Sequence, residues 1–495
     1  MPTLYWGLTA LRRTLPLTTL AVALAALYLY GLNGVGVLSS DEPRYSAIGF
    51  AMAHTHDFIT PRLWGSPWFE KPALLYWLIA AGASLGLGPE LAGRLPVALL
   101  SLAFVAAYFA LLRREFCRSA AAVSTAALAT SAAWLGFSSI AVTDIPLAVF
   151  FGLATILALP LIGGKSTSAS RRLAAIGICL GLAALAKGFV PFALALPFFW
   201  FLRSYWRKWW IAVLWCLAVA APWYIAVSLR NGTAFWDEFF IKHHLERLYS
   251  QSLQHVQPWY YYFPVLLASL FPWTPLLGLL HYRRKDWDRR RLFLATVVVF
   301  GFVFFSLSLN KLPGYLLPLL PALFALIGAR FESMRVVELK RGWLMACAAL
   351  AALIPLLAGI IPRALEGQRG LLHLIGHISR TEAFYVAVPI AVVLLARRTW
   401  APIVLVISIV ASGIYLKHAV DPVLDRSVSA RGLWRSLDTE RDKICDAGLH
   451  RNWEYGLAFY NHGPIPACSG RPGEIALKQQ DNRPPVLERL TIPKK

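Results

Sequence analysis

The sequence predicts an all-α protein that crosses a membrane many times. Of its 495 residues, 58% are hydrophobic and only 15% are charged, which is unlike a soluble globular domain. Apolar runs near the length needed to cross a bilayer recur from residue 14 to residue 417. The remainder, 418–495, has no such run and is predicted to be a small α/β domain.

Clusters of basic residues set the predicted topology. The net charge is +22, but the Lys and Arg residues gather in short loops between apolar runs, as in cytoplasmic loops under the positive-inside rule. The clusters lie at residues 12–13, 113–118, 165–172, 203–208, 283–291, 335–341 and 397–398. We therefore expect a cytoplasmic N-terminus and no nucleic-acid binding, which would need a basic face on a soluble surface.

The first apolar run, 14–35, is too long for a signal peptide and has no convincing cleavage site, so it is predicted to be a retained span. Run 73–88 is short and rich in Gly, and an even number of spans must separate the first two basic clusters. We therefore expect 73–88 to lie along the membrane interface.

About thirteen spans remain, the fifth and sixth being short enough that a bent hairpin around Lys187 is an alternative. They are 14–35, 91–112, 119–139, 145–162, 173–186, 188–202, 209–229, 258–280, 292–309, 312–330, 342–361, 381–397 and 400–417.

This count divides the chain into a transmembrane domain, 1–417, and an outer, periplasmic domain, 418–495. In the outer domain, residues 453–463 are predicted to form a strand and a turn. Cys445 and Cys468 are predicted to form a disulfide in an oxidising compartment, because so small a domain gains from a cross-link; two unrelated thiols are the alternative. The other cysteines, in or beside predicted spans, are expected to be core residues: Cys117, Cys179, Cys216 and Cys347.

The polar residues outside the basic clusters all fall on the outer side of this topology. They are segment 36–90, Asp144, Lys187, loop 230–257, Asn310–Lys311 and the tail. Separate polar segments that converge on one face of a membrane protein predict a site.

Two of these positions carry carboxylates with both a structural and a functional interpretation. Asp41 follows Ser39 and Ser40 at a predicted helix start, where it favours a cap, but it could also be a general base while a serine caps. Asp144, between two spans, has the same two interpretations.

The cations and imidazoles are equally ambiguous. Glu70–Lys71 is interpreted either as a surface ion pair or as a cation ligand beside a phosphate-binding lysine.

Lys187 lies within a long apolar stretch, so it either extends its amine to the interface or binds an anion; we favour the anion. Loop 230–257 adds His243, His244 and Arg247, and its imidazoles could face Glu70 in a metal or acid–base site, although a lone His is usually structural.

These stretches resemble the membrane glycosyltransferases of the C superfamily (GT-C), in the branch of the bacterial 4-amino-4-deoxy-L-arabinose transferase of lipid A and its protein O-mannosyltransferase-like relatives. The resemblance covers about 280 residues and is carried by DEPRYSAIGFAM (41–52), TPRLWGSPWFEKPALLYW (60–77), AVTDIPLAV (141–149), AKGFVP (186–191), FWDEFFIKHHLERL (235–248), PWYYYFPVLLASLFPWTPLL (258–277) and SLSLNKLPGYLLPLLP (306–321).

The resemblance implies transfer of a sugar from a polyprenyl-phosphate donor to a lipid or glycan acceptor at the outer face of the bacterial inner membrane, with inversion. It implies a catalytic role for Asp41 and a second acidic position at Asp144. It implies that a divalent metal, expected to be zinc, is held by Glu70 and His244. The residues implied to lie near the lipid phosphate are Lys71, Lys187, Arg247 and Tyr315.

The chain departs from the family pattern in two places. The expected KLPTY reads KLPGY, with Gly314 in place of Thr, and the tail is shorter than in typical lipid A aminoarabinose transferases. The resemblance therefore does not assign the identity of the transferred sugar or of the acceptor. Two other classes predict different patterns: a transporter or flippase would place charges at mid-membrane on inverted repeats, and a non-catalytic assembly subunit would not need an acid at residue 41.

Overall fold

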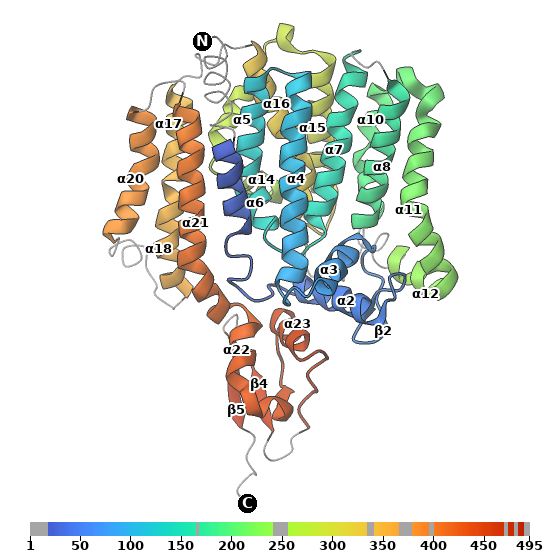
Figure 1. The fold of residues 1–495 in the computed structure, drawn as a ribbon, viewed down its shortest axis with the longest axis vertical. Helices are drawn as coiled ribbons and strands as arrows, with labels where there is room; N and C mark the ends of the chain where they lie inside the picture. The colour runs from blue at the N-terminus through green and yellow to red at the C-terminus, as the bar shows by residue number, and fades with distance from the viewer. Residues whose placement is uncertain are drawn as a thin grey trace, which may run out of the picture.

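A computed structural model describes residues 18–164, 168–240, 256–333, 341–365, 379–395, 400–469, 474–479 and 484–489. Figure 1 shows a bundle of long helices with a small C-terminal domain attached at one end. Helices α7 (Asp144–Ile162) and α16 (Leu320–Ser333) form the interior of the bundle, since they are buried along most of their length. The chain is a multi-pass membrane protein.

Eight helical segments in the described part of the chain are long and apolar enough to cross a membrane. They are Leu91–Glu115 (α4), Asp144–Ile162 (α7), Ala169–Lys187 (α8), Arg203–Asn231 (containing α11, Trp209–Asn231), Arg289–Leu307 (α15), Pro313–Glu332 (most of α16), Gly342–Leu365 (α17, Arg341–Ala351, and α18, Leu353–Leu365) and Ala401–Ser427 (α21).

The other predicted spans are helical but shorter or broken. They correspond to Thr18–Leu29, α5 (Arg118–Ala129) with α6 (Ala132–Phe137), α9 (Val190–Leu194) with α10 (Leu196–Phe201), the stretch Trp259–Leu280 containing α14 (Tyr262–Ser269), and α20 (Arg380–Leu395). The stretch 259–280 bends by 106° and would be a ninth span if it crosses. The count of thirteen therefore stays a prediction.

The segment between the first two spans lies at one end of the bundle (Figure 1). It contains α2 (Asp41–Thr55), an antiparallel hairpin of β1 (Arg62–Leu63) and β2 (Ser66–Pro67), and α3 (Leu74–Ser84). Helix α3 has 11 residues, about half the length needed to span hydrocarbon. This agrees with the prediction that 73–88 does not cross.

The C-terminal domain lies at the same end of the bundle as α2 and α3 (Figure 1). Helix α21 continues past residue 417 to Ser427 and leads into the domain. The domain packs two helices, α22 (Ala430–Leu437) and α23 (Arg451–Tyr460), with a sheet in the order β3-β4-β5. Strand β3 (Ile444–Asp446) is parallel to β4 (Ile475–Lys478), which is antiparallel to β5 (Val486–Arg489).

Two predictions for this domain have opposite outcomes. The Cys445–Cys468 disulfide is present. The strand predicted at 453–463 is wrong, because Arg451–Tyr460 forms α23. Trp453 and Leu457 are both buried in the domain core, and their spacing of four residues places them on one face of a helix. The aromatic residues of this short segment favoured a strand, but burial of this face determines the structure.

Candidate active site

Four charged side chains form a network between α2 and the loop before α3. The Arg44 guanidinium donates to Asp41 Oδ1 and, through its other terminal nitrogen, to Glu70 Oε2 at 2.6 Å. Lys71 Nζ lies 3.0 Å from the second oxygen, Glu70 Oε1. Two acids and two bases therefore meet, and the prediction of a surface Glu70–Lys71 pair is wrong, since both residues are buried.

The network presents one carboxylate to solvent. The Asp41 side chain is 38% exposed, whereas Arg44 is 5% exposed. Burial alone would lower the pKa of Arg44, but the carboxylates of Glu70 and Asp41 raise it above its usual value. The guanidinium therefore stays charged and fixes the orientation of the Asp41 carboxylate from one side.

The start of α2 explains why Asp41 projects outward. Ser39 has a left-handed backbone (φ 59°) and its hydroxyl accepts from the Asp41 amide at 3.3 Å. Ser40 occupies the N-cap position without a side-chain bond. One of the two predicted serines thus supports the helix start, and Asp41 is not needed as a cap.

Glu42 has a structural role. Its carboxylate forms a paired contact with Arg94, with both N–O distances 2.7 Å, and also accepts from the backbone amides of Leu38 and Ala141. It is 1% exposed. Because Ala141 lies three residues before Asp144, Glu42 ties the start of α2 to the loop that leads into α7.

The second charged group lies where α7 begins and α8 ends. Lys187 Nζ donates to Asp144 Oδ1 at 2.7 Å and lies 4.6 Å from the ring centroid of Tyr315. The anion that Lys187 contacts in the structure is a carboxylate of the protein itself, Asp144. Three residues predicted for the site are therefore in contact.

Gly314, the departure from the family pattern, packs against this group. A Cβ at this position would lie 2.6 Å from Asp144 Oδ1 and 2.9 Å from Phe137 Cε1. The glycine allows a close approach of the chain to Asp144; it has no positive φ. A side chain here would push Asp144 away from its present position.

Apolar packing brings the two charged groups to the same region. Phe69 and Ala73, which flank Glu70 and Lys71, share a buried cluster with Ala184 and Leu185, just before Lys187. Leu74 packs against a second buried cluster, formed by Leu147 of α7 with Ala183 and Ala186 of α8. The loop with Glu70 therefore lies against the helix ends that carry Asp144 and Lys187.

Two predicted site residues, His244 and Arg247, lie outside the described residues. Among those described, no group of three or more His, Cys, Asp or Glu side chains could hold a metal. Each oxygen of Glu70 already accepts from a cation, Arg44 or Lys71. Two cations beside this carboxylate would repel a divalent ion, so Glu70 as it stands does not fit a metal ligand, and no step is derived through a metal.

Sequence reasoning missed Arg44 as the centre of the first group. Its position three residues after Asp41 on a predicted helix gave a usable signal, because such side chains are neighbours. Its contact with the Tyr455 ring, at 5.1 Å, joins residues 411 positions apart, and no sequence pattern indicated it. Lys311, noted with Lys187, instead donates to the backbone carbonyls of Gln257 and Ser308.

The bundle, the segment between the first two spans and the small C-terminal domain give the chain the GT-C fold of membrane glycosyltransferases. The crystal structure of ArnT from Cupriavidus metallidurans bound to undecaprenyl phosphate aligns over 95% of this chain and 87% of that one, with a TM-score of 0.73 and 23% identity. The crystal structure of an oligosaccharyltransferase from Archaeoglobus fulgidus in the apo form aligns over 95% of this chain and 65% of that one, with a TM-score of 0.52 and 12% identity. These identities support the fold alone.

The sequence comparisons confirm the predicted resemblance. Residues 14–236 match the family described as dolichyl-phosphate-mannose-protein mannosyltransferase. An undecaprenyl phosphate-alpha-4-amino-4-deoxy-L-arabinose arabinosyl transferase from Pseudomonas aeruginosa (strain LESB58) is 32% identical, covering 62% of this chain and 58% of the relative. The protein named undecaprenyl phosphate-alpha-4-amino-4-deoxy-L-arabinose arabinosyl transferase 1 from Pseudomonas fluorescens (strain ATCC BAA-477) is 34% identical, covering 64% of this chain and 59% of the relative. The matches thus span about three fifths of these relatives' length.

Proposed function

We propose that this protein is an integral membrane glycosyltransferase that moves a sugar from a polyprenyl-phosphate donor to a lipid A-like or other cell-surface acceptor. The observation that carries the proposal is the pairing of an exposed carboxylate, Asp41, with cations that are buried or partly buried at one end of the bundle. A lipid phosphate leaving group needs the cations, and an acceptor hydroxyl or amine needs the carboxylate.

The roles follow from exposure and partners. Arg44 is bonded to Oδ1 of Asp41, and among the described side chains no hydrogen bond to Oδ2 is found. In the proposed step the acceptor attacks the anomeric carbon, and its proton passes to Asp41. The bond from the anomeric carbon to the phosphate oxygen breaks with the electron pair going to the phosphate. A single displacement inverts that carbon.

Lys187 is the side chain best placed to receive the lipid phosphate. It is paired with Asp144 and stacked on Tyr315, so a phosphate oxygen could replace or join the carboxylate at the ammonium. Lys71, 8% exposed, is proposed as the second phosphate-binding cation. Arg247 is proposed from the family resemblance.

An apolar cavity supports a polyprenyl donor. It has a volume of about 250 Å³ and lies between α8, α10 and α11, with Leu173, Leu180, Phe198, Trp209 and Leu217 in its walls. Leu180 lies seven residues before Lys187 on α8, about 10 Å along the helix axis. An isoprenoid chain whose phosphate lies at Lys187 would be within reach of this cavity.

The proposed setting is the bacterial inner membrane, with the N-terminus cytoplasmic and the C-terminal domain periplasmic. The Cys445–Cys468 disulfide supports a periplasmic domain, because disulfides persist in that oxidising compartment. The transferred sugar is proposed to be a pentose or hexose. The relatives named above support aminoarabinose as the first sugar to assay.

The test is a transfer assay with the purified full chain in lipid nanodiscs, undecaprenyl-phosphate aminoarabinose and lipid A. Asp41→Asn should lower kcat by at least about a hundredfold, the size expected for loss of a general base. Glu454→Gln, an acid on α23 without a role in the network, is the matched control. Transfer by Asp41→Asn at the wild-type rate would remove the catalytic assignment.

A further inference from the structure

The backbone that leads into Asp41 is held from the bundle side by one arginine. Arg94, on α4, is buried and donates to three carbonyls of this loop, those of Leu32, Val35 and Gly36 at 3.0, 2.6 and 2.9 Å. Its Nε and Nη2 form the paired contact with Glu42, and Nη2 also makes the bond to Gly36. Arg94 therefore fixes both the loop and the first turn of α2.

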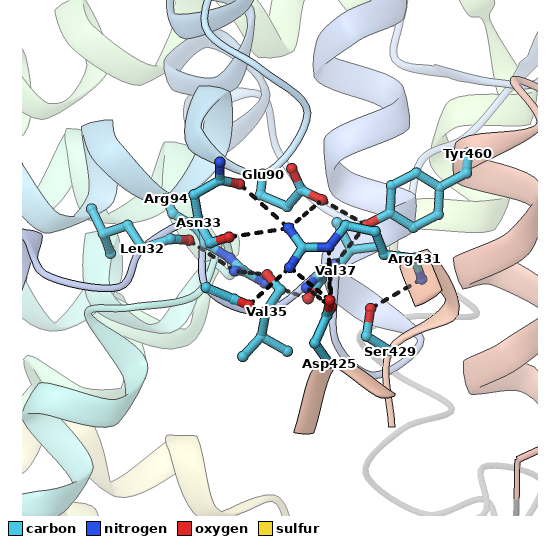
Figure 2. A network of polar contacts seen from close by, with 12 residues as sticks. Leu32, Asn33, Val35, Val37, Glu90, Arg94, Asp425, Ser429, Arg431 and Tyr460 are labelled. Carbon is cyan, nitrogen blue, oxygen red and sulfur yellow. Dashed lines mark hydrogen bonds and ion pairs between the residues drawn. The ribbon is translucent and has the colours of Figure 1, made fainter. Parts of the chain in front are cut away.

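A second arginine holds the same loop from the C-terminal domain (Figure 2). Arg431, at the start of α22, donates to the carbonyls of Asn33 and Gly34 at 3.1 and 2.8 Å. It also pairs with Asp425 at 2.9 Å and Glu90 at 3.4 Å. Burial would lower the pKa of Arg431, but Asp425 and Glu90 raise it above its usual value. It is therefore a charged donor to the loop.

Tyr460 completes this contact (Figure 2). Its hydroxyl accepts from the Val37 amide at 3.1 Å and donates to Glu90 Oε1 at 2.8 Å. A Cβ on Gly36 would lie 2.6 Å from that hydroxyl and 2.2 Å from Ser429 Oγ. The loop and the C-terminal domain thus meet without space for a side chain at residue 36.

The C-terminal domain also reaches the charged network directly. The Tyr455 ring lies 5.1 Å from the Arg44 guanidinium carbon, and Phe459 packs edge-on against Phe50 of α2. Helix α23 therefore contacts α2 at Phe50 and also contacts Arg44, the side chain that orients Asp41.

We infer that Arg431 and Tyr460 are positioning residues for Asp41: the C-terminal domain holds loop 31–38 in the form that directs this carboxylate at the acceptor. The inference rests on the proposed function, because it assigns a purpose to the same site. Neither residue touches the reacting atoms; both act through the loop, Arg431 at residues 33 and 34 and Tyr460 at residue 37.

The mildest test is Tyr460→Phe, which removes one hydroxyl and keeps the ring that packs in the domain. We expect kcat to fall about tenfold, because small displacements of a catalytic group cost up to about a hundredfold. The KM for undecaprenyl-phosphate aminoarabinose should stay within about twofold, since the cations lie on α8 and near α3. Arg431→Met should give a larger loss of kcat in the same direction.

The matched control is Arg435→Ala, an exposed arginine on the same helix, α22. Hydrogen–deuterium exchange gives a readout apart from activity: peptides covering 31–42 should exchange faster in Tyr460→Phe than in wild type or Arg435→Ala, while peptides covering 144–162 should not change.

Three results would overturn the inference: an unchanged kcat for Tyr460→Phe, a loss of kcat with unchanged exchange at 31–42, or a rise in KM that accounts for the whole loss. A different failure is distinguishable from these. If wild-type protein binds undecaprenyl phosphate but transfers no sugar, the proposed function fails, and the exchange measurement alone decides whether the domain holds the loop.

Discussion

Lys187 donates to Asp144 at 2.7 Å, and each side chain is at most 15% exposed. This pair joins the end of α8 to the start of α7, and Tyr315 adds an aromatic face to the cation. A buried ion pair is weak evidence for stability, because the desolvation of two charges offsets their attraction. The pair lies at the end of the bundle that also carries Asp41, and we therefore interpret Lys187 as a binding group for the lipid phosphate.

Replacement of Lys187 by Met tests that interpretation. Removing the charged partner of a bound phosphate costs about 2–5 kcal/mol, so kcat/KM for the lipid-linked donor should fall at least about thirtyfold if the phosphate binds at Lys187. Initial rates at varied donor concentration measure this. Lys285→Met, an exposed lysine in the loop before α15, should keep the wild-type value. Equal donor dependence in both variants would contradict phosphate binding at Lys187.

Arg44→Lys tests the bridge between Asp41 and Glu70. A guanidinium can bond two carboxylates at once through separate nitrogens, and an ammonium cannot match that geometry. We therefore expect kcat to fall about tenfold or more, with Arg44→Gln lower still. Arg62→Gln, a half-exposed arginine near Asp57, is the control. An Arg44→Lys enzyme with wild-type kcat would show that Asp41 needs no fixed orientation.

Gly314→Ala tests the close approach to Asp144. The new Cβ would lie 2.6 Å from Asp144 Oδ1, and overpacking of this kind costs about 1–3 kcal/mol. We expect a lower melting temperature together with weaker donor use. Gly136→Ala, where a Cβ meets no atom within 4 Å, should show neither effect. A Gly314→Ala protein that melts and reacts like wild type would mean that Asp144 can move without consequence.

The Tyr460 hydroxyl gives a pH dependence of stability. Burial, and next the neighbouring Glu90, raise the pKa of Tyr460 above its usual value near 10. The stability from the neutral phenol is then complete below about pH 10 and is lost as the pH rises above that value. The stability difference between wild type and Tyr460→Phe should shrink above pH 10. Thermal melts from pH 7 to 11 check this, and a constant difference would contradict it.

The predicted metal is open to a direct measurement. Because Arg44 and Lys71 occupy both oxygens of Glu70, we expect transfer rates within about twofold of the untreated value after dialysis against EDTA. Elemental analysis of the purified protein should find no stoichiometric zinc. Zinc at one per chain, with activity lost on its removal and restored on its return, would reinstate Glu70 and His244 as ligands.

The sequence allowed prediction of the features that depend on long patterns. Lengths of apolar runs and the parity of basic clusters led to the helical bundle and to the non-spanning segment that contains α3. The spacing of Cys445 and Cys468 in a small polar tail led to their disulfide. These patterns are informative because the thickness of the bilayer sets the length of each span and the positive-inside rule applies to whole loops.

Contacts between distant segments were beyond such reasoning. The Arg94–Glu42 pair joins residues 52 positions apart, and the Arg431–Gly34 bond joins residues 397 apart. Charged residues at these positions have many permitted partners until the fold is known. Helix α23 was mistaken for a strand for the same reason: its burial depends on the sheet and on α22, which pattern alone does not place.

The bond from Arg431 to Gly34 has a consequence for biogenesis. The ribosome makes the loop before Asp41 and its first partner, Arg94, early, but the second arginine that holds the loop lies 397 positions after Gly34, about 20–80 seconds later at usual elongation rates. A nascent chain would therefore carry the carboxylate proposed for catalysis on a loop held from the bundle side alone through most of its insertion into the membrane. Under the proposed function and positioning role, full transfer activity would begin only after the C-terminal domain has closed against the bundle, so incomplete chains would use little of the proposed lipid-linked donor.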